Sequence, residues 1–247
     1  MAKDALPENT RVLQISPMLN DPSNLDVSKF SYEEWLGYFF EQRLLAEDEF
    51  FGDAFCSGYL SFEASDPVKV VSYLQRICTE FSVISGKYSL PQLNQGFWAI
   101  LGPDFELQQY LWQQSVPLTD RTACIRSMYR PYANFIAGHP AAVMENCFDM
   151  WWDLVLKSYR WRQHNGNYDF TRLDSDGRAL LDAAFETLCL ILSLNDERCQ
   201  AYALHGLGHL HHPGVIQVVQ RFIDSHRSEM NSENLLWLEQ CRDGTVM

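Results

Sequence analysis

Proline and glycine interrupt this chain at short intervals, and between the interruptions apolar residues recur every three or four positions. That spacing is the period of an α-helix, whereas a half-buried strand alternates apolar and polar residues. No such alternating run is evident, and the apolar segments are about a dozen to twenty residues long. The pattern predicts an all-α fold. The expected helices are 31–45, 65–85, 89–101, 104–115, 119–137, 139–161, 178–195, 196–212, 213–226 and 232–241.

Local signals support several of these boundaries. Ser31 and Glu34 have the spacing of a capping box at a helix start. Pro67 suits a first helical turn, and Pro131 lies inside a helical pattern, where a kink or a break is expected. One buried face of the second helix is predicted to carry Val70, Leu74, Ile77 and Phe81.

The length of the chain limits its domain organisation. At 247 residues it is near the upper end of what one compact domain usually holds. Residues 1–28 are rich in Pro, Asn, Asp and Ser and predict an irregular amino-terminal arm. We expect residues 29–247 to form a single all-helical domain, which could divide into halves at 29–117 and 118–247.

Charge restricts the partners that the protein can have. Thirty-two acidic residues against nineteen basic ones give a formal net charge of −13, which repels nucleic acid and anionic membranes and attracts a basic protein. No apolar stretch reaches the length of a signal peptide or a membrane span. Seven cysteines without a Cys-x-x-Cys pair indicate reduced, buried thiols. These features predict a cytoplasmic protein that binds neither nucleic acid nor membrane.

Residues 196–226 predict a helical hairpin. Cys199, Ala203, Leu207 and Leu210 share one face of its first helix, and Pro213 breaks that helix before a second apolar stripe begins. The stripe consists of Val215, Val219 and Phe222, with Ile216 and Ile223 beside them. Gly206 and Gly208 each cost about 1 kcal/mol relative to alanine inside a helix, which predicts the close approach of a neighbouring helix.

The sequence pattern of this hairpin resembles that of a known family. Ala203-Leu204-x-Gly206-Leu207-Gly208-x-Leu210 followed by Pro213 and an apolar helix is similar to one unit of the HEAT family of helical repeats. The resemblance covers about thirty residues. It implies an irregular helical array of the α-solenoid kind, with HEAT-like hairpins at the carboxyl end, a last helix at 233–241 as a cap, and an extended binding surface.

A second resemblance concerns the whole chain. The chain looks similar to bacterial immunity proteins that neutralise polymorphic or contact-dependent toxins. It shares with them its acidic charge, its size and an irregular helical pattern, and it contains the stretch "ALHGLGHLHH". This resemblance implies a cognate toxin as the partner.

The histidines of the hairpin allow two interpretations. His205 and His209 are four residues apart, which is a spacing that zinc ligands use, and His212 extends the line. The glutamate of a His-Glu-x-x-His motif is absent, and His211 and His212 fall at the turn. We expect satisfied structural histidines and no cofactor or metal, with a metal site at His205 and His209 as the alternative.

A row of acidic residues is the predicted partner-binding surface. Glu145, Asp149 and Asp153 share one helix face, where like charges four apart destabilise a helix. A basic partner would offset that repulsion, and an adjacent tryptophan could anchor it. The predicted surface comprises Glu145, Asp149, Trp152, Asp153, Asp182 and Glu186.

Together these features favour a non-enzymatic inhibitor. The chain has no Gly-x-Ser-x-Gly and no phosphate-binding glycine loop. The leading hypothesis is an immunity protein that neutralises a basic toxin through an acidic helical surface, away from the turn of the hairpin. The alternatives are a HEAT-like scaffold or adaptor for an endogenous protein, and a metal-dependent enzyme using His205 and His209.

Overall fold

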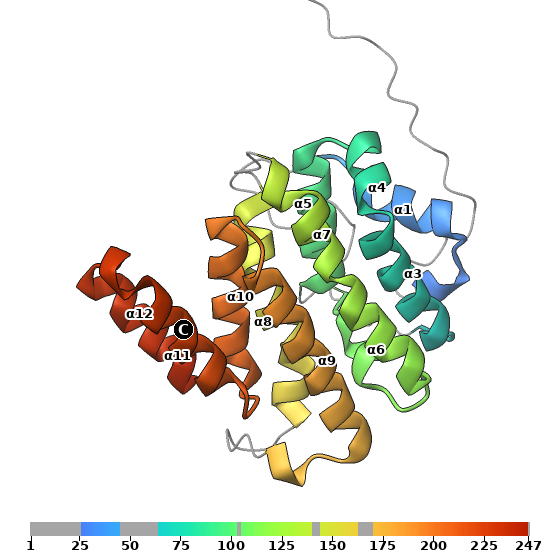
Figure 1. The fold of residues 1–247 in the computed structure, drawn as a ribbon. Helices are drawn as coiled ribbons and strands as arrows, with labels where there is room; N and C mark the ends of the chain where they lie inside the picture. The colour runs from blue at the N-terminus through green and yellow to red at the C-terminus, as the bar shows by residue number, and fades with distance from the viewer. Residues whose placement is uncertain (1–25, 45–63, 103–104, 140–143, 163–169, 247) are drawn as a thin grey trace, which may run out of the picture.

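The structure is a computed structural model that describes residues 26–44, 64–102, 105–139, 144–162 and 170–246. Within these ranges the chain is helical and contains no strand, which confirms the predicted all-α irregular array. Figure 1 shows the helices α1, α3 and α4 at one end of the array, α8, α9 and α10 in the middle, and α11 and α12 at the other end.

The amino-terminal end is built from short helices. Ser31 accepts from the backbone N–H of Glu34, and the Glu34 carboxylate accepts from Ser31, so the predicted capping box is confirmed. The predicted arm boundary at residue 28 falls inside a 3₁₀ turn whose Val27 and Ser28 are buried; the rest of the arm lies outside the described residues. The elements are η3 (Val27–Lys29), α1 (Tyr32–Phe40), α3 (Pro67–Thr79), α4 (Phe81–Lys87) and α5 (Leu90–Leu101).

Two predicted helices are interrupted. The helix expected at 65–85 divides at Glu80 into α3 and α4, yet both pieces bury the predicted face. Pro131 cannot donate a backbone hydrogen bond, and its ring would clash with the carbonyl four residues earlier in a continuous helix. The helix expected at 119–137 is accordingly interrupted between Ser127 and Tyr129, as predicted. The elements of the middle are η4 (Leu107–Trp112), α6 (Leu118–Ser127), α7 (Tyr129–Asn134) and η5 (Ile136–Gly138).

The carboxyl-terminal part contains the longest helices. Asp174 caps α9 and Asp196 caps α10, each through its side chain. Helix α10 packs against α8 and α9, and α12 packs against both α10 and α11. The elements are α8 (Glu145–Arg162), η8 (Phe170–Arg172), α9 (Ser175–Leu192), α10 (Glu197–Leu210), α11 (Val215–His226), η9 (Arg227–Glu229) and α12 (Ser232–Asp243).

One buried hydrophobic cluster extends from Val27 to Val246. It crosses the boundary between the predicted halves, where the Trp112 indole N–H donates to the carbonyl of Val155 at 3.1 Å. The aromatic rings of α1, α5 and α8 supply much of this cluster. The two predicted halves therefore share a core.

The glycines of α10 lie where other parts of the chain come close. A Cβ at Gly206 would lie 2.8 Å from both Trp152 Cβ and Leu188 Cδ2. One at Gly208 would lie 3.1 Å from Cys241 Cα, which belongs to the backbone of α12. The predicted close approach of neighbouring helices is confirmed at both positions.

Buried thiols are spread through the core. Five of the described cysteines are buried, and Cys189 is half-buried. Burial raises the pKa of Cys78, Cys199 and Cys241 to about 12, because a thiolate loses its hydration there. These side chains are neutral thiols at neutral pH. The buried set is Cys78, Cys124, Cys147, Cys199 and Cys241.

Candidate functional site

The predicted acidic row and the predicted histidine row meet between α8 and α10. Asp149 and Asp153 are one turn apart on α8, and His205 and His209 are one turn apart on α10. Because residues four apart share a helix face, two packed helices bring both pairs together. The sequence interpretation treated the two rows separately, and the structure joins them.

The contacts form a chain of side chains across the helix pair. His205 Nδ1 lies 3.0 Å from Asp149 Oδ1, and His205 Nε2 lies 2.9 Å from His209 Nε2. His209 Nε2 lies 3.7 Å from Asp153 Oδ1. The His205 side chain is nearly buried, whereas the Asp149 carboxylate is partly exposed. We call these four residues the His–Asp cluster.

The proton positions in the cluster follow from the chemistry of the groups. A carboxylate only accepts, so His205 Nδ1–H donates to Asp149. Between the two facing Nε2 atoms one must donate and the other accept. If both imidazoles were protonated, both Nε2 atoms would carry hydrogen and their bond would be lost. The His–His bond therefore forms only while at least one ring is neutral.

The cluster favours the protonated form of His205. The hydrogen bond to Asp149 raises the pKa of His205, and its burial acts in the opposite direction. A histidine whose pKa is raised on folding stabilises the fold most below its unfolded pKa of about 6.5. That contribution falls as the pH rises through the pKa of the folded state.

We expect the variant Asp149→Asn to lower the pKa of His205, because it removes the charge that favours the imidazolium and leaves the effect of burial. An NMR titration of the His205 ring carbons measures this pKa. The control is Asp182→Asn, which removes a carboxylate that contacts His212 instead. An unchanged His205 titration in Asp149→Asn would show that the contact does not set the pKa.

The metal alternative concerns the same two histidines. In this structure their Nε2 atoms lie within hydrogen-bond distance of each other. Among the residues that the structure describes, no group of three or more His, Cys, Asp or Glu side chains could hold a metal ion.

His212 is held as a structural residue at the turn after α10. Its Nδ1 accepts from the backbone N–H of Gly214, so its Nε2 carries the hydrogen and donates to Asp182 Oδ1, each at 3.0 Å. Its ring stacks on Phe185 and meets Phe170 edge-on. Both ring nitrogens of His212 are thus hydrogen-bonded within the protein.

The other described residues of the predicted surface are buried or belong to α9. Trp152 is buried and packs against Gly206, so the prediction that it anchors a partner at the surface is wrong for this structure. Asp182 and Glu186 lie on α9, where Glu186 accepts from Arg126 at 3.0 Å. Glu145 begins α8, and its side chain lies outside the described part of the chain.

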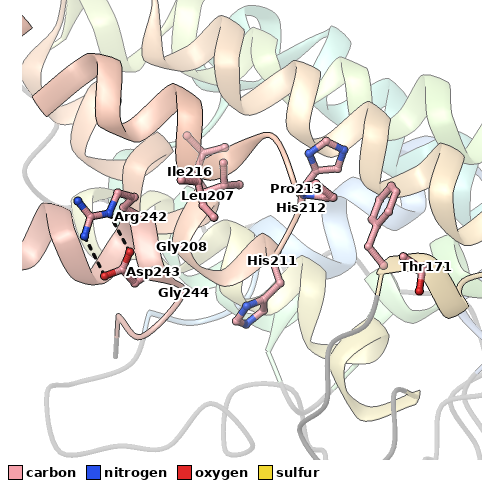
Figure 2. Close-up of a pocket in the computed structure, with 12 residues that line it drawn as sticks. Thr171, Leu207, Gly208, His211, His212, Pro213, Ile216, Arg242, Asp243 and Gly244 are labelled. Carbon is pink, nitrogen blue, oxygen red and sulfur yellow. Dashed lines mark hydrogen bonds and ion pairs between the residues drawn. The ribbon is translucent and has the colours of Figure 1, made fainter. Parts of the chain in front are cut away.

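A pocket lies at the turn between α10 and α11, a place where the sequence interpretation did not expect function. Its volume is about 360 Å³. Figure 2 shows Arg242 and Asp243 on one side and His212 and Thr171 on the other. The lining comprises Phe170, Thr171, Leu207, Gly208, His211, His212, Pro213, Val215, Ile216, Arg242, Asp243 and Gly244.

Sequence interpretation missed two features of this region. It placed Ile216 beside the buried stripe of α11, but Ile216 is 59% exposed and lines the pocket. It also did not single out Arg242 and Asp243. Gly244, a glycine directly after an apolar helix, is a signal for the helix end that could have drawn attention to them.

Comparison of the chain with models of protein families, with curated proteins and with solved structures finds no match. No helix in the described ranges is both long and apolar enough to cross a membrane.

Proposed function

We propose that this chain is a non-enzymatic inhibitor of the immunity-protein kind, which binds a basic protein toxin in the cytoplasm and neutralises it. The observation that carries the proposal is a net charge of −13 on an all-helical array. Such a charge attracts a basic partner over long range and speeds its association. Stoichiometric binding needs a surface and no catalytic group.

The exposed side of α9 is the part of the predicted surface that best fits this role. Asp182, Glu186 and Leu190 follow one another at four-residue spacing, and all three are exposed. Interfaces that form and dissociate are about as polar as the rest of a protein surface and have a polar rim, where such carboxylates can lie. All four carboxylates have a basic or histidine partner, but the side chains of Asp182 and Glu186 are 53% and 58% exposed, whereas those of Asp149 and Asp153 are 40% and 20% exposed.

The experiment is to mix the purified protein with the product of the neighbouring gene. We expect a stable complex in size-exclusion chromatography, protection of cells that express the neighbouring product, and association that slows as salt is added. Glu186→Lys should weaken binding by about tenfold, because it places a positive charge in the acidic stripe.

The matched control is Glu33→Lys, which makes the same charge change at an exposed site on α1, away from α9. Equal weakening by both variants would assign the effect to net charge rather than to α9. Absence of both a complex and protection would refute the proposed function.

A further inference from the structure

Two helix carboxyl ends meet at the pocket. Helix α10 ends at Leu210 and is followed by His211 in the left-handed conformation, with φ of 52°. Helix α12 ends at Asp243 and is followed by Gly244 with φ of 70°. In Figure 2 Gly208, His211 and Gly244 lie together where these ends meet. Each helix carboxyl end carries roughly half a negative charge, so this side of the pocket attracts cations.

The remainder of the lining is largely apolar. Leu207, Val215, Ile216 and Phe170 provide aliphatic and aromatic surface beside the helix ends. A volume of about 360 Å³ is at the lower end of the range of about 300–1,000 Å³ found for ligand pockets. The cavity therefore fits an elongated group with an apolar stem and a cationic head.

The charged residues of the lining are consistent with a cation. The three guanidinium nitrogens of Arg242 donate to the carboxylate of Asp243, at 2.8 and 3.0 Å, and to Gln220, at 2.8 Å. Arg242 and Asp243 form an ion pair with no net charge, so the two helix carboxyl ends set the sign of the electrostatic potential at the pocket. The Arg242 hydrogen bonds lower the pKa of Asp243, whose carboxylate is half-exposed beside the cavity. His212 also has both nitrogens engaged.

We propose that this pocket is a binding site for an arginine side chain of the protein partner, an inference that rests on the proposed function. The methylene stem would pack on Leu207 and Ile216, and the guanidinium would meet Asp243 and the two helix ends. Arginine fits better than lysine because its guanidinium is more weakly hydrated and stacks on an aromatic ring, which Phe170 supplies. Arginine is also one of the residues that dominate binding energy at interfaces.

The test uses a small probe, so that it does not depend on the partner. Nα-acetyl-arginine amide is titrated into the full-length protein at low salt, and NMR shifts of the pocket residues are followed. The neutral isostere Nα-acetyl-citrulline amide and Nα-acetyl-lysine amide are titrated in parallel. We expect saturable shifts at Ile216 and Gly244 with the arginine probe, and binding about tenfold weaker for citrulline.

Two variants that each introduce a tryptophan at an exposed position localise the binding. Ile216→Trp fills the mouth of the pocket from a side chain that is 59% exposed, and it should weaken arginine binding by about tenfold. Val83→Trp is the control, at a position on α4 that is 74% exposed, and it should bind like the unchanged protein. Thermal melting of both variants checks that they remain folded.

The outcomes separate this inference from the proposed function. Equal binding of arginine and citrulline, or no effect of Ile216→Trp, would overturn the arginine pocket even if the complex with the neighbouring product forms. Lysine binding as tight as arginine would overturn the selectivity for a guanidinium. Arginine binding in the pocket without any complex would leave the pocket established and refute the inhibitor.

Discussion

Replacing Asp176 with alanine is expected to lower the free energy of unfolding by about 3 kcal/mol. Asp176 on α9 accepts a short hydrogen bond from Arg121 on α6, and the Arg121 side chain is only 2% exposed. A guanidinium cannot lose its proton at neutral pH, so removal of the carboxylate leaves a buried charge without its partner. Urea denaturation followed by circular dichroism measures the change.

The size of this effect depends on burial. The Asp176 side chain is 32% exposed, which places the expected loss at the lower end of the 3–5 kcal/mol found when fully buried ion pairs are broken. The Nε atom of Arg121 already lacks a hydrogen-bond partner among the described residues. Little remains in the surroundings of Arg121 to compensate for the carboxylate.

The chain offers a matched control between the same two helices. Arg126 on α6 and Glu186 on α9 also form an ion pair, but their side chains are 53% and 58% exposed. Glu186→Gln should lower the free energy of unfolding by less than about 1 kcal/mol, because an exposed ion pair is little more favourable than the two charges separately hydrated. Losses of equal size in the two variants would contradict the assignment of the effect to the buried arginine.

Replacing Gly206 with alanine should lower the free energy of unfolding by about 1–3 kcal/mol. Alanine favours a helix over glycine by about 1 kcal/mol, but the new methyl would lie 2.8 Å from Trp152 Cβ and from Leu188 Cδ2. Trp152 Cβ is attached directly to the backbone of α8 and cannot turn away. The steric cost of the new methyl should therefore exceed the gain in helix propensity. Urea denaturation measures whether the free energy of unfolding falls or rises.

Gly86→Ala is the control for Gly206→Ala. Gly86 also lies inside a helix, α4, and no atom lies within 4 Å of the position that a Cβ would occupy. Its replacement should raise stability by up to about 1 kcal/mol. A stable Gly206→Ala protein would mean that α8 and α10 can separate without cost, which would contradict the close packing of the pair.

Features encoded by neighbouring residues were predictable from the sequence. The capping box of Ser31 and Glu34 and the break before Pro131 each depend on a short stretch whose conformation is restricted by sterics or hydrogen bonding. Gly206 and Gly208 indicated a close approach because glycine is otherwise unfavourable inside a helix, although the residues that they meet could not be named. The division of α3 from α4 at Glu80 was not predictable, because the apolar spacing continues through the break.

Contacts between distant residues could not be predicted in the same way. Asp149 and His205 are 56 positions apart, and their pairing depends on how α8 is rotated against α10. The same rotation turns Trp152 inward, three residues from an aspartate that is partly exposed. Helical spacing defines which residues share a face but does not state which face meets which neighbour, so the residues of the His–Asp cluster were identifiable while their contact was not.

The buried cysteines make local unfolding of this protein measurable by thiol alkylation. Because a neutral thiol without solvent access reacts slowly with alkylating reagents, each buried cysteine is modified only when the surrounding helices separate. Cys147 lies on α8, Cys199 on α10 and Cys241 on α12. The order in which these thiols are alkylated therefore reports which helix separates first from the core. The native chain thus carries reporters of local unfolding at successive positions along its array, and no label needs to be introduced.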